Sequence, residues 1–171
     1  LGLIANEYRR GLSAVEVDPM TAMVFRLLAK TYQNDQQVFI KGTNFTNNLM
    51  PALLRLWPEI KLLLMWSDLE SFLVSVCKHR AEAEQNLWPF LRAFLIDEGI
   101  PSYRHTEWES LDLIQQAVWT WTLQIRLFKS LLMGQNEFSQ HDIKTLSAAE
   151  FLANPLAYVQ LIYQRLGVLY D

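Results

Sequence analysis

Residues 60–76 read IKLLLMWSDLESFLVSV, and this stretch decides the fold prediction. The run from Lys61 to Trp66 is almost continuously apolar, which is typical of a parallel strand covered on both faces. After Ser67 and Asp68 the apolar residues change to helical spacing. We therefore predict a buried strand that leads into a helix, the kind of junction at which many α/β proteins bind phosphate.

The flanking sequence extends this junction into alternating strands and helices. Residues 37–41 (QVFIK) are predicted to form a strand, and a helix is predicted to follow over Asn48–Trp57. Together with the strand at Lys61–Trp66 they make a strand–helix–strand unit, whose crossover is expected to be right-handed. Residues 142–146 are predicted to form a last strand. The fold class that follows is α/β, with a small parallel sheet flanked by helices.

Helix boundaries are predicted from capping residues and from proline. Asp18-Pro19 is predicted to start a helix, because Asp is a favoured N-cap and Pro is favoured at the first helical position. The helix after the junction is expected to continue toward Pro89, which must end or kink it. Near the C-terminus, Ser147 is expected to cap one helix with Glu150. Residues 154–167 are expected to form the final helix, from Asn-Pro to Gly.

A long helix is predicted between residues 106 and 134. Residues 106–109 (TEWE) have the spacing of a capping box, and Gly134 is expected to stop the helix. We interpret it as a core helix on the sheet, and the alternative is a coiled-coil or partner-binding seam. Its apolar positions recur at steps of three and four residues: Leu111, Ile114, Val118, Trp121, Ile125, Phe128 and Leu132.

Composition restricts the class of protein. Apolar residues make up 51% of the chain and charged residues 19%, which indicates a core-rich globular protein, and we expect a single domain over residues 1–171. The net charge of −3 provides no basic surface for nucleic acid. The longest apolar runs are far shorter than the roughly 18 residues of a membrane span. The one cysteine, Cys77, is expected on a buried helix face, and the absence of a partner for it favours a reducing compartment and a cytoplasmic location.

Common catalytic and metal-binding patterns are missing from the sequence. His79, His105 and His141 lie far apart, and none has a second ligand at helical spacing, so no metal site is predicted. Neither a Gly-rich dinucleotide loop nor a Walker phosphate loop occurs in these residues. The junction at residues 66–75 therefore remains the most informative place for chemistry.

Two stretches resemble the sulfotransferase family. Residues 38–79, VFIKGTNFTNNLMPALLRLWPEIKLLLMWSDLESFLVSVCKH, are similar to the middle of the family, and residues 143–168, IKTLSAAEFLANPLAYVQLIYQRLGV, are similar to its closing segment. The resemblance implies the sulfotransferase branch of the P-loop fold. It also implies sulfuryl transfer from the donor phosphoadenosine phosphosulfate to a hydroxyl or amine of a small-molecule or carbohydrate acceptor.

The resemblance also assigns candidate site residues. By position, Lys41 would face the transferred sulfuryl group as the catalytic residue, and Ser75 would bind the 3′-phosphate of the donor. Ser67 stands where the family has an arginine for that phosphate, so it is the second candidate for donor binding. The residues themselves leave alternatives open. Ser67 and Glu70 have the spacing of a capping box, and Lys41 and Ser75 have the chemistry of solvated side chains.

The sequence departs from the family at positions that matter for catalysis. The histidine base of many members falls on Thr43, and the phosphosulfate loop that precedes this region in the family is missing. We therefore expect a domain that is incomplete at its N-terminus, with the donor loop in front of Leu1, and we expect the 171 residues alone to be inactive. Two alternatives remain: a sulfotransferase-like binding or structural module without catalysis, and a helical protein-interaction domain that uses the Leu111 to Leu132 face.

Overall fold

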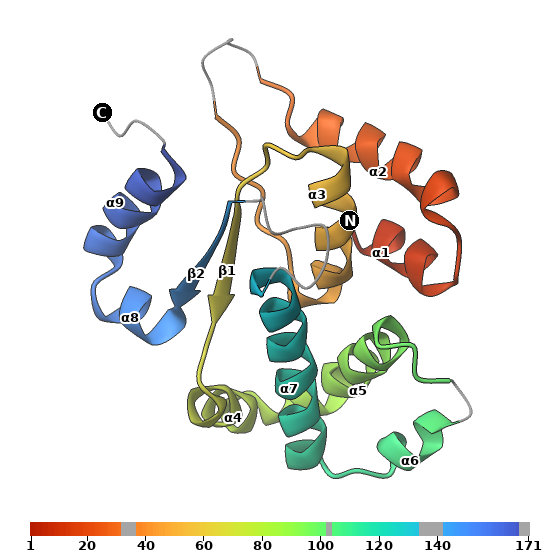
Figure 1. The fold of residues 1–171 in the computed structure, drawn as a ribbon. Helices are drawn as coiled ribbons and strands as arrows, with labels where there is room; N and C mark the ends of the chain where they lie inside the picture. The colour runs from red at the N-terminus through yellow and green to blue at the C-terminus, as the bar shows by residue number, and fades with distance from the viewer. Residues whose placement is uncertain (32–36, 102–103, 134–141, 168–171) are drawn as a thin grey trace.

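The computed structural model describes residues 1–31, 37–101, 104–133 and 142–167, and it places helices around a two-stranded sheet (Figure 1). The elements follow in chain order as α1 (Gly2–Arg9), α2 (Ala14–Leu28), the 3-10 helix η1 (Asn44–Leu49), α3 (Met50–Leu56), β1 (Leu62–Trp66), α4 (Leu69–Lys78), α5 (Arg80–Asp97), α6 (His105–Glu109), α7 (Leu113–Leu132), β2 (Ile143–Ser147), α8 (Ala148–Ala153) and α9 (Pro155–Leu166).

The sheet consists of β1 and β2, which pair in parallel. Their register runs from Leu62 opposite Ile143 to Trp66 opposite Ser147, and Leu64 at the centre of β1 is buried. A parallel pair needs a long crossover, and here helices α4 to α7 provide it. The prediction of an α/β chain with a small parallel sheet flanked by helices is therefore confirmed at this level. The last strand begins and ends one residue later than predicted.

Residues 37–41 do not form the predicted strand. Val38, Phe39 and Ile40 are exposed, and in the described residues β1 pairs with β2 alone. β-branched and aromatic residues favour a strand only where a neighbouring strand offers hydrogen bonds and a surface to pack on. The Phe39 ring packs instead against Tyr163 of α9, with ring centroids 5.6 Å apart. The strand–helix–strand unit thus runs from β1 to β2, not from residues 37–41 to β1.

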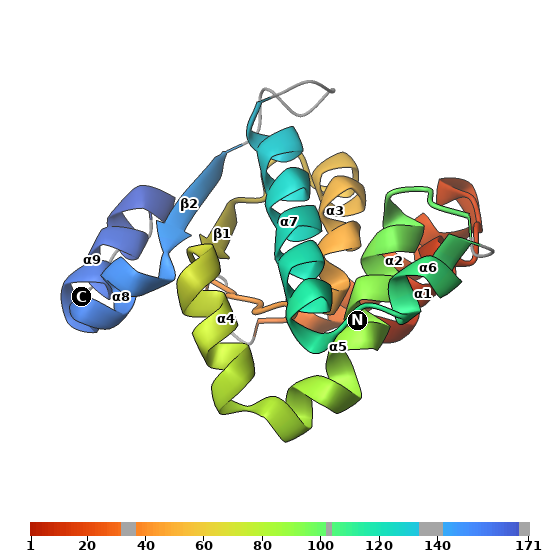
Figure 2. The same ribbon diagram turned by 90° about the horizontal axis from the view of Figure 1, so that it is seen from below.

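The helices divide into two groups on either side of the sheet. Both views place α8 and α9 beyond β2 and α3 and α7 beyond β1, with α4 below the end of β1 (Figures 1 and 2). Helices α1 and α2 form the far side of the larger group, where they pack on η1 and α3. The larger group therefore holds most of the core, and the β1 edge faces it.

Helix α7 is the centre of this core. It packs on α5, α4 and β1, so the prediction that this segment forms a core helix on the sheet is confirmed. Ile114 and Leu132 of the predicted stripe are exposed, and the buried residues of α7 are Ala117, Thr120, Leu123, Phe128 and Leu131. The clusters of described residues that include α7 are Phe128 and Leu131 with Leu54 and Leu64, Leu123 with Leu91, Phe94 and Leu95, and Ala117 with Val76 and Leu87.

The start of α7 was predicted wrongly. Residues 106–109 lie inside the short helix α6, and the chain begins a new helix after Asp112. The Asp112 backbone is extended, its carboxylate accepts a hydrogen bond from the Gln115 amide at 2.8 Å, and the Gln115 side chain accepts one from the Asp112 amide at 3.0 Å. This reciprocal capping box stops α6 from continuing into α7. The predicted stop at Gly134 lies outside the described residues.

The predicted helix start at Asp18-Pro19 is also wrong. Helix α2 begins at Ala14, after the N-cap Ser13, whose amide and hydroxyl both donate to the Glu16 carboxylate. Pro19 therefore lies inside the helix, beyond the first turn where its missing N–H would cost nothing. Asp18 has a different partner set: it accepts hydrogen bonds from Tyr8 and Arg55.

The helix after β1 ends earlier than predicted. Helix α4 stops at Lys78, His79 breaks the chain direction with φ −110° and ψ 40°, and α5 then continues through Pro89 to Asp97. Cys77, predicted to be buried, is exposed. Val76 is the buried residue of this turn, and adjacent helical positions differ in direction by about 100°.

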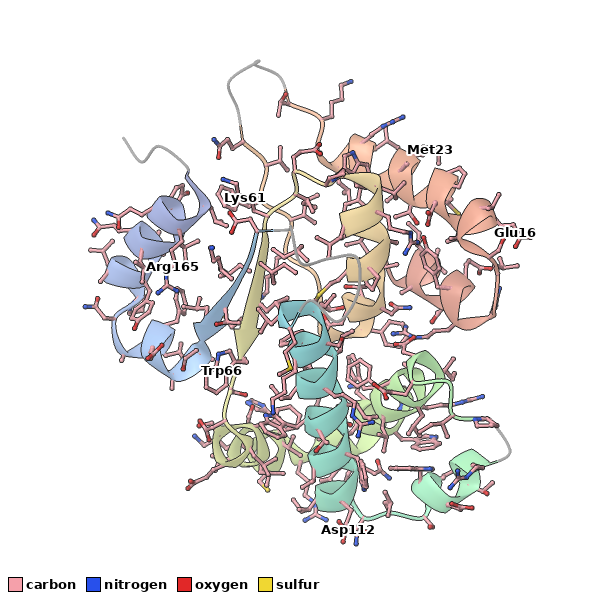
Figure 3. The ribbon with its side chains drawn as sticks, in the orientation of Figure 1. Glu16, Met23, Lys61, Trp66, Asp112 and Arg165 are labelled. Atoms are coloured by element: carbon pink, nitrogen blue, oxygen red, sulfur yellow. The ribbon has the colours of Figure 1, made fainter. Side chains whose placement is uncertain are left out.

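The predicted bounds of the C-terminal helices are confirmed, and of the predicted capping box the structure records the bond to Ser147. Ser147 caps α8 by accepting a hydrogen bond from the Glu150 amide, and α9 begins at Pro155 after the N-cap Asn154. Gly167 ends α9 with a left-handed φ of 62°. Lys61, at the start of β1, donates from Nζ to the carbonyl of Leu166 and so holds the end of α9 against the sheet (Figure 3).

Candidate functional site

The strand–helix junction expected from the sequence lies where β1 ends above α4 (Figure 3). β1 ends at Trp66, and α4 begins at Leu69 after the extended residue Asp68. The Asp68 carboxylate accepts hydrogen bonds from the Ser71 amide at 2.8 Å and from the Ser71 hydroxyl at 2.7 Å. Asp68 is therefore the N-cap of α4.

This carboxylate occupies the place that an anionic ligand would take at the helix N-terminus. The hydrogen bond from the Ser71 amide, followed by that from its hydroxyl, holds the pKa of Asp68 below its usual range. Asp68 is thus charged at neutral pH, and Glu70 adds a second carboxylate in the first turn. A phosphate at this position would meet two negative charges and would have to displace an existing cap.

Ser67, predicted as the helix cap and as a donor-binding candidate, is not the cap. The cap lies one residue later, because the Asp68 carboxylate reaches both polar groups of Ser71. Ser67 contributes through its backbone instead: its carbonyl oxygen accepts a hydrogen bond from Nε1 of Trp121 at 2.8 Å. This bond ties the junction to α7, the central core helix.

The other two candidates lie apart from the capped end of α4. Ser75 is an exposed residue of α4 on a face away from the buried Val76, and its carbonyl oxygen accepts the amide hydrogen bond of His79. Lys41 is exposed in the segment before η1. In the described part of the chain, no hydrogen bond or ion pair joins the side chains of Lys41, Ser67 and Ser75. Their assigned roles therefore stay predictions.

A second site, which the sequence did not indicate, is a cavity of about 430 Å³ between α1, α3, α5 and α7. Its walls are mainly apolar, and its polar groups come from segments far apart in the sequence. The residues that matter for its chemistry are Arg9, Asn48, Arg55, Asp97, Glu98 and Gln124.

Arg9 and Asp97 form the charged centre of this cavity. The Arg9 side chain is 4% exposed, and that of Asp97 is 20% exposed. Arg9 donates from Nε and Nη2 to the Asp97 carboxylate, at 3.0 Å and 2.7 Å, and from Nη2 to the Phe45 carbonyl at 2.8 Å. The guanidinium also lies 4.4 Å from the centre of the Phe45 ring. The position of Arg9 is therefore fixed from three directions.

Burial is the largest influence on the Asp97 carboxyl group. It raises the pKa of Asp97 above its ordinary value, and the hydrogen bonds and charge of Arg9 offset only part of this increase. The amide of Asn48 also lowers the pKa, so Asn48 and Arg9 both lie against the same carboxylate. The ion pair is thus a partly buried one, with a real desolvation cost.

A second polar group lies at the edge of the cavity. The Tyr8 hydroxyl donates to Asp18, and Arg55 donates from Nη2 to the same carboxylate at 3.2 Å. Burial and, after it, the Asp18 hydrogen bond raise the pKa of Tyr8. Because Arg55 and Asp18 pair with each other, Tyr8 and Arg55 line the cavity without adding net charge.

No family model, curated protein or solved structure matches this chain. Within residues 1–31, 37–101, 104–133 and 142–167, no three potential ligand side chains gather as a metal site. Of the three histidines, His79 is exposed at the α4–α5 break, whereas the His105 side chain and His141 lie outside the description. The helices of these same ranges are all too short or too polar to cross a membrane.

Proposed function

We propose that this chain is a sulfotransferase-like module that transfers a sulfuryl group only when a phosphosulfate loop completes its donor site. The observation that carries the proposal is the parallel pair β1–β2 with only two residues between the end of β1 at Trp66 and the start of α4 at Leu69. In open α/β sheets, ligands bind beyond the carboxyl ends of the strands. Ser75 belongs to α4 itself, on the helix that follows this strand end.

The proposed reaction is a displacement at sulfur. The acceptor oxygen or nitrogen attacks the sulfur of phosphoadenosine phosphosulfate, and the bond from sulfur to the bridging phosphate oxygen breaks. The proton of the acceptor passes to a base that the completing segment supplies, and phosphoadenosine phosphate leaves with the new negative charge. Lys41 would stabilise the charge on the transferred group, and Ser75 would contact the 3′-phosphate.

The chain alone is proposed to be inactive. Asp68 accepts the hydrogen bond of the Ser71 amide in the first turn of α4, and no arginine stands at position 67 to offset its charge. The same observation favours a second candidate, a sulfotransferase-like module that has a binding or structural role and no catalytic activity. A helical interaction domain based on the Leu111 to Leu132 face is less favoured, because α7 already packs on α4, α5 and β1.

Titration with phosphoadenosine phosphate, followed by NMR of the backbone amides, tests the family assignment. We expect weak binding, with shifts in the first turn of α4 and at Lys41. Asp68→Asn keeps a good N-cap but removes the charge, so it should tighten binding several-fold. Ser75→Ala should weaken it.

Asp112→Asn is the matched control, because Asp112 caps α7 in the same way that Asp68 caps α4. It should leave the affinity for phosphoadenosine phosphate unchanged. If neither the native chain nor Asp68→Asn shifts these amides, the sulfotransferase assignment is lost. Tight binding by the native chain would instead contradict the proposal that it is inactive alone.

A further inference from the structure

Residues 37–41 form an exposed apolar segment outside the sheet. Val38, Phe39 and Ile40 are 42%, 54% and 38% exposed, and Gln37 and Lys41 on either side of them are exposed as well. The chain runs here as an extended trace into η1 (Figure 1). Because consecutive large apolar side chains are unfavourable in water, a partner that covers them would stabilise this surface.

The backbone of this segment is open to a partner too. Within the described part of the chain, the N–H and C=O groups of residues 38–41 make no backbone–backbone hydrogen bond. The side chains of Val38, Phe39 and Ile40 are of the types that favour strands. An extended segment with such side chains and unused backbone groups provides what an added strand needs. The segment predicted as a strand can therefore become one beside a strand from another molecule.

The segment QVFIK is complementary to itself in the antiparallel direction. With Phe39 opposite Phe39 of a second copy, Val38 lies opposite Ile40 and Gln37 lies opposite Lys41. Apolar side chains then face apolar side chains, and the one charge of the segment faces a neutral amide. A parallel, in-register pairing would instead place the two Lys41 side chains next to each other. The charge of Lys41 therefore favours the antiparallel direction.

The contact between Phe39 and α9 gives the segment two distinct faces. The Phe39 ring packs on Tyr163, with ring centroids 5.6 Å apart and an angle of 58° between the ring planes. Alternate residues of an extended strand point to opposite faces, so Phe39 lies on the α9 side and Val38 and Ile40 lie on the other. Antiparallel pairing of two copies would join the two Phe39 rings on one face and the Val38 and Ile40 side chains on the other.

We propose that residues 37–41 form the contact of a two-fold homodimer, in which the segments of two copies pair as antiparallel strands centred on Phe39. The same surface is used on both copies, so the assembly closes at two. A ribbon of two short strands is a small interface, so the dimer is weak and its population depends on the protein concentration. This contact does not depend on the function proposed for the α4 junction.

Disulfide trapping of the full chain tests the register. Cys77 is exposed, so both test variants carry Cys77→Ser. Phe39→Cys places two thiols opposite each other at the axis, where the Cα atoms of paired strands are about 4.5–5.5 Å apart and a disulfide can form. Gln37→Cys places them about 14 Å apart along the strands. With oxidised glutathione we expect a covalent dimer for Phe39→Cys alone. Equal trapping at the two positions, or trapping at neither, would overturn the proposal.

Charged variants test the same contact without a covalent bond, by sedimentation equilibrium. Val38→Lys and Ile40→Glu each place a charge against an apolar residue of the second copy, so each alone should associate about tenfold more weakly than the native chain. In a mixture the new lysine faces the new glutamate, so a heterodimer should form more tightly than either homodimer, and added salt should weaken it. Leu3→Lys on α1, where Leu3 is 82% exposed, is the matched control and should associate like the native chain. A native chain that stays monomeric at its highest soluble concentration, or a mixture that associates no better than its components, refutes the dimer.

Discussion

The α4 junction and the cavity between α1, α3, α5 and α7 both bring charged groups against the core, and they differ in how their polar atoms are satisfied. At the junction, Asp68 accepts two hydrogen bonds from Ser71, three residues away. In the cavity, Arg9 pairs with Asp97 across the molecule, and one of its donors is left over. The junction is satisfied within itself, whereas the cavity is not.

The substitution with the largest expected effect on stability is Arg9→Ala. It should lower the free energy of unfolding by about 3 kcal/mol, because it leaves the Asp97 carboxylate partly buried without its partner. Arg10→Ala, at the C-cap of the same helix, is the matched control, since the Arg10 side chain is 73% exposed and pairs with Glu7. Urea unfolding measures both. Equal effects of the two substitutions would mean that the Arg9–Asp97 pair has no special role.

The difference between the two sites also explains what the sequence could predict. β1, α4 and the C-terminal helix α9 are specified by local signals: an apolar run, a change of period, and the pair Asn154-Pro155. Errors of one or a few residues arose where two caps competed. Ser67 and Asp68 both suit the start of α4, and only the contact with Ser71 decides between them.

The cavity could not be predicted in this way. Arg9, Asn48 and Asp97 lie on separate elements, and nothing near Arg9 in the sequence distinguishes it from Arg10. The strand prediction for residues 37–41 was wrong for a related reason. Strand propensity takes effect only beside a neighbouring strand, and the local sequence does not show whether one is present. Local chemistry is readable from sequence, whereas pairing across the fold requires the structure.

A smaller effect tests which residue caps α4. Asp68→Ala should lower the Tm by about 2–4 °C, because it removes the acceptor of the first-turn amide. Ser67→Ala should leave the Tm nearly unchanged, since Ser67 holds Trp121 through its backbone carbonyl, which alanine retains. Thermal unfolding followed by circular dichroism distinguishes the two. A larger loss of Tm for Ser67→Ala than for Asp68→Ala would instead support the capping box of Ser67 and Glu70 expected from the sequence.

The smallest effect is a pH dependence with opposite signs at the two sites. Burial raises the pKa of Asp97, so the native state holds this proton more strongly than the unfolded state does. The stability of the native chain relative to Asp97→Asn should therefore be greatest below the ordinary Asp value of 3.8, and it should fall as the pH rises through the raised pKa.

Asp68 should behave in the opposite way. The hydrogen bonds from Ser71 lower its pKa, so its contribution is present above pH 3.8 and is lost as the pH falls through the lowered value. Urea unfolding of the native chain, Asp97→Asn and Asp68→Asn is measured from about pH 2.5 to about pH 7. Subtracting the curve of each variant from that of the native chain removes the contributions that the other carboxylates make to the pH dependence. The curves should slope in opposite directions. Parallel slopes would show that Asp97 is stabilised by Arg9 as fully as Asp68 is by Ser71, and the distinction between a satisfied junction and an unsatisfied cavity would then be lost.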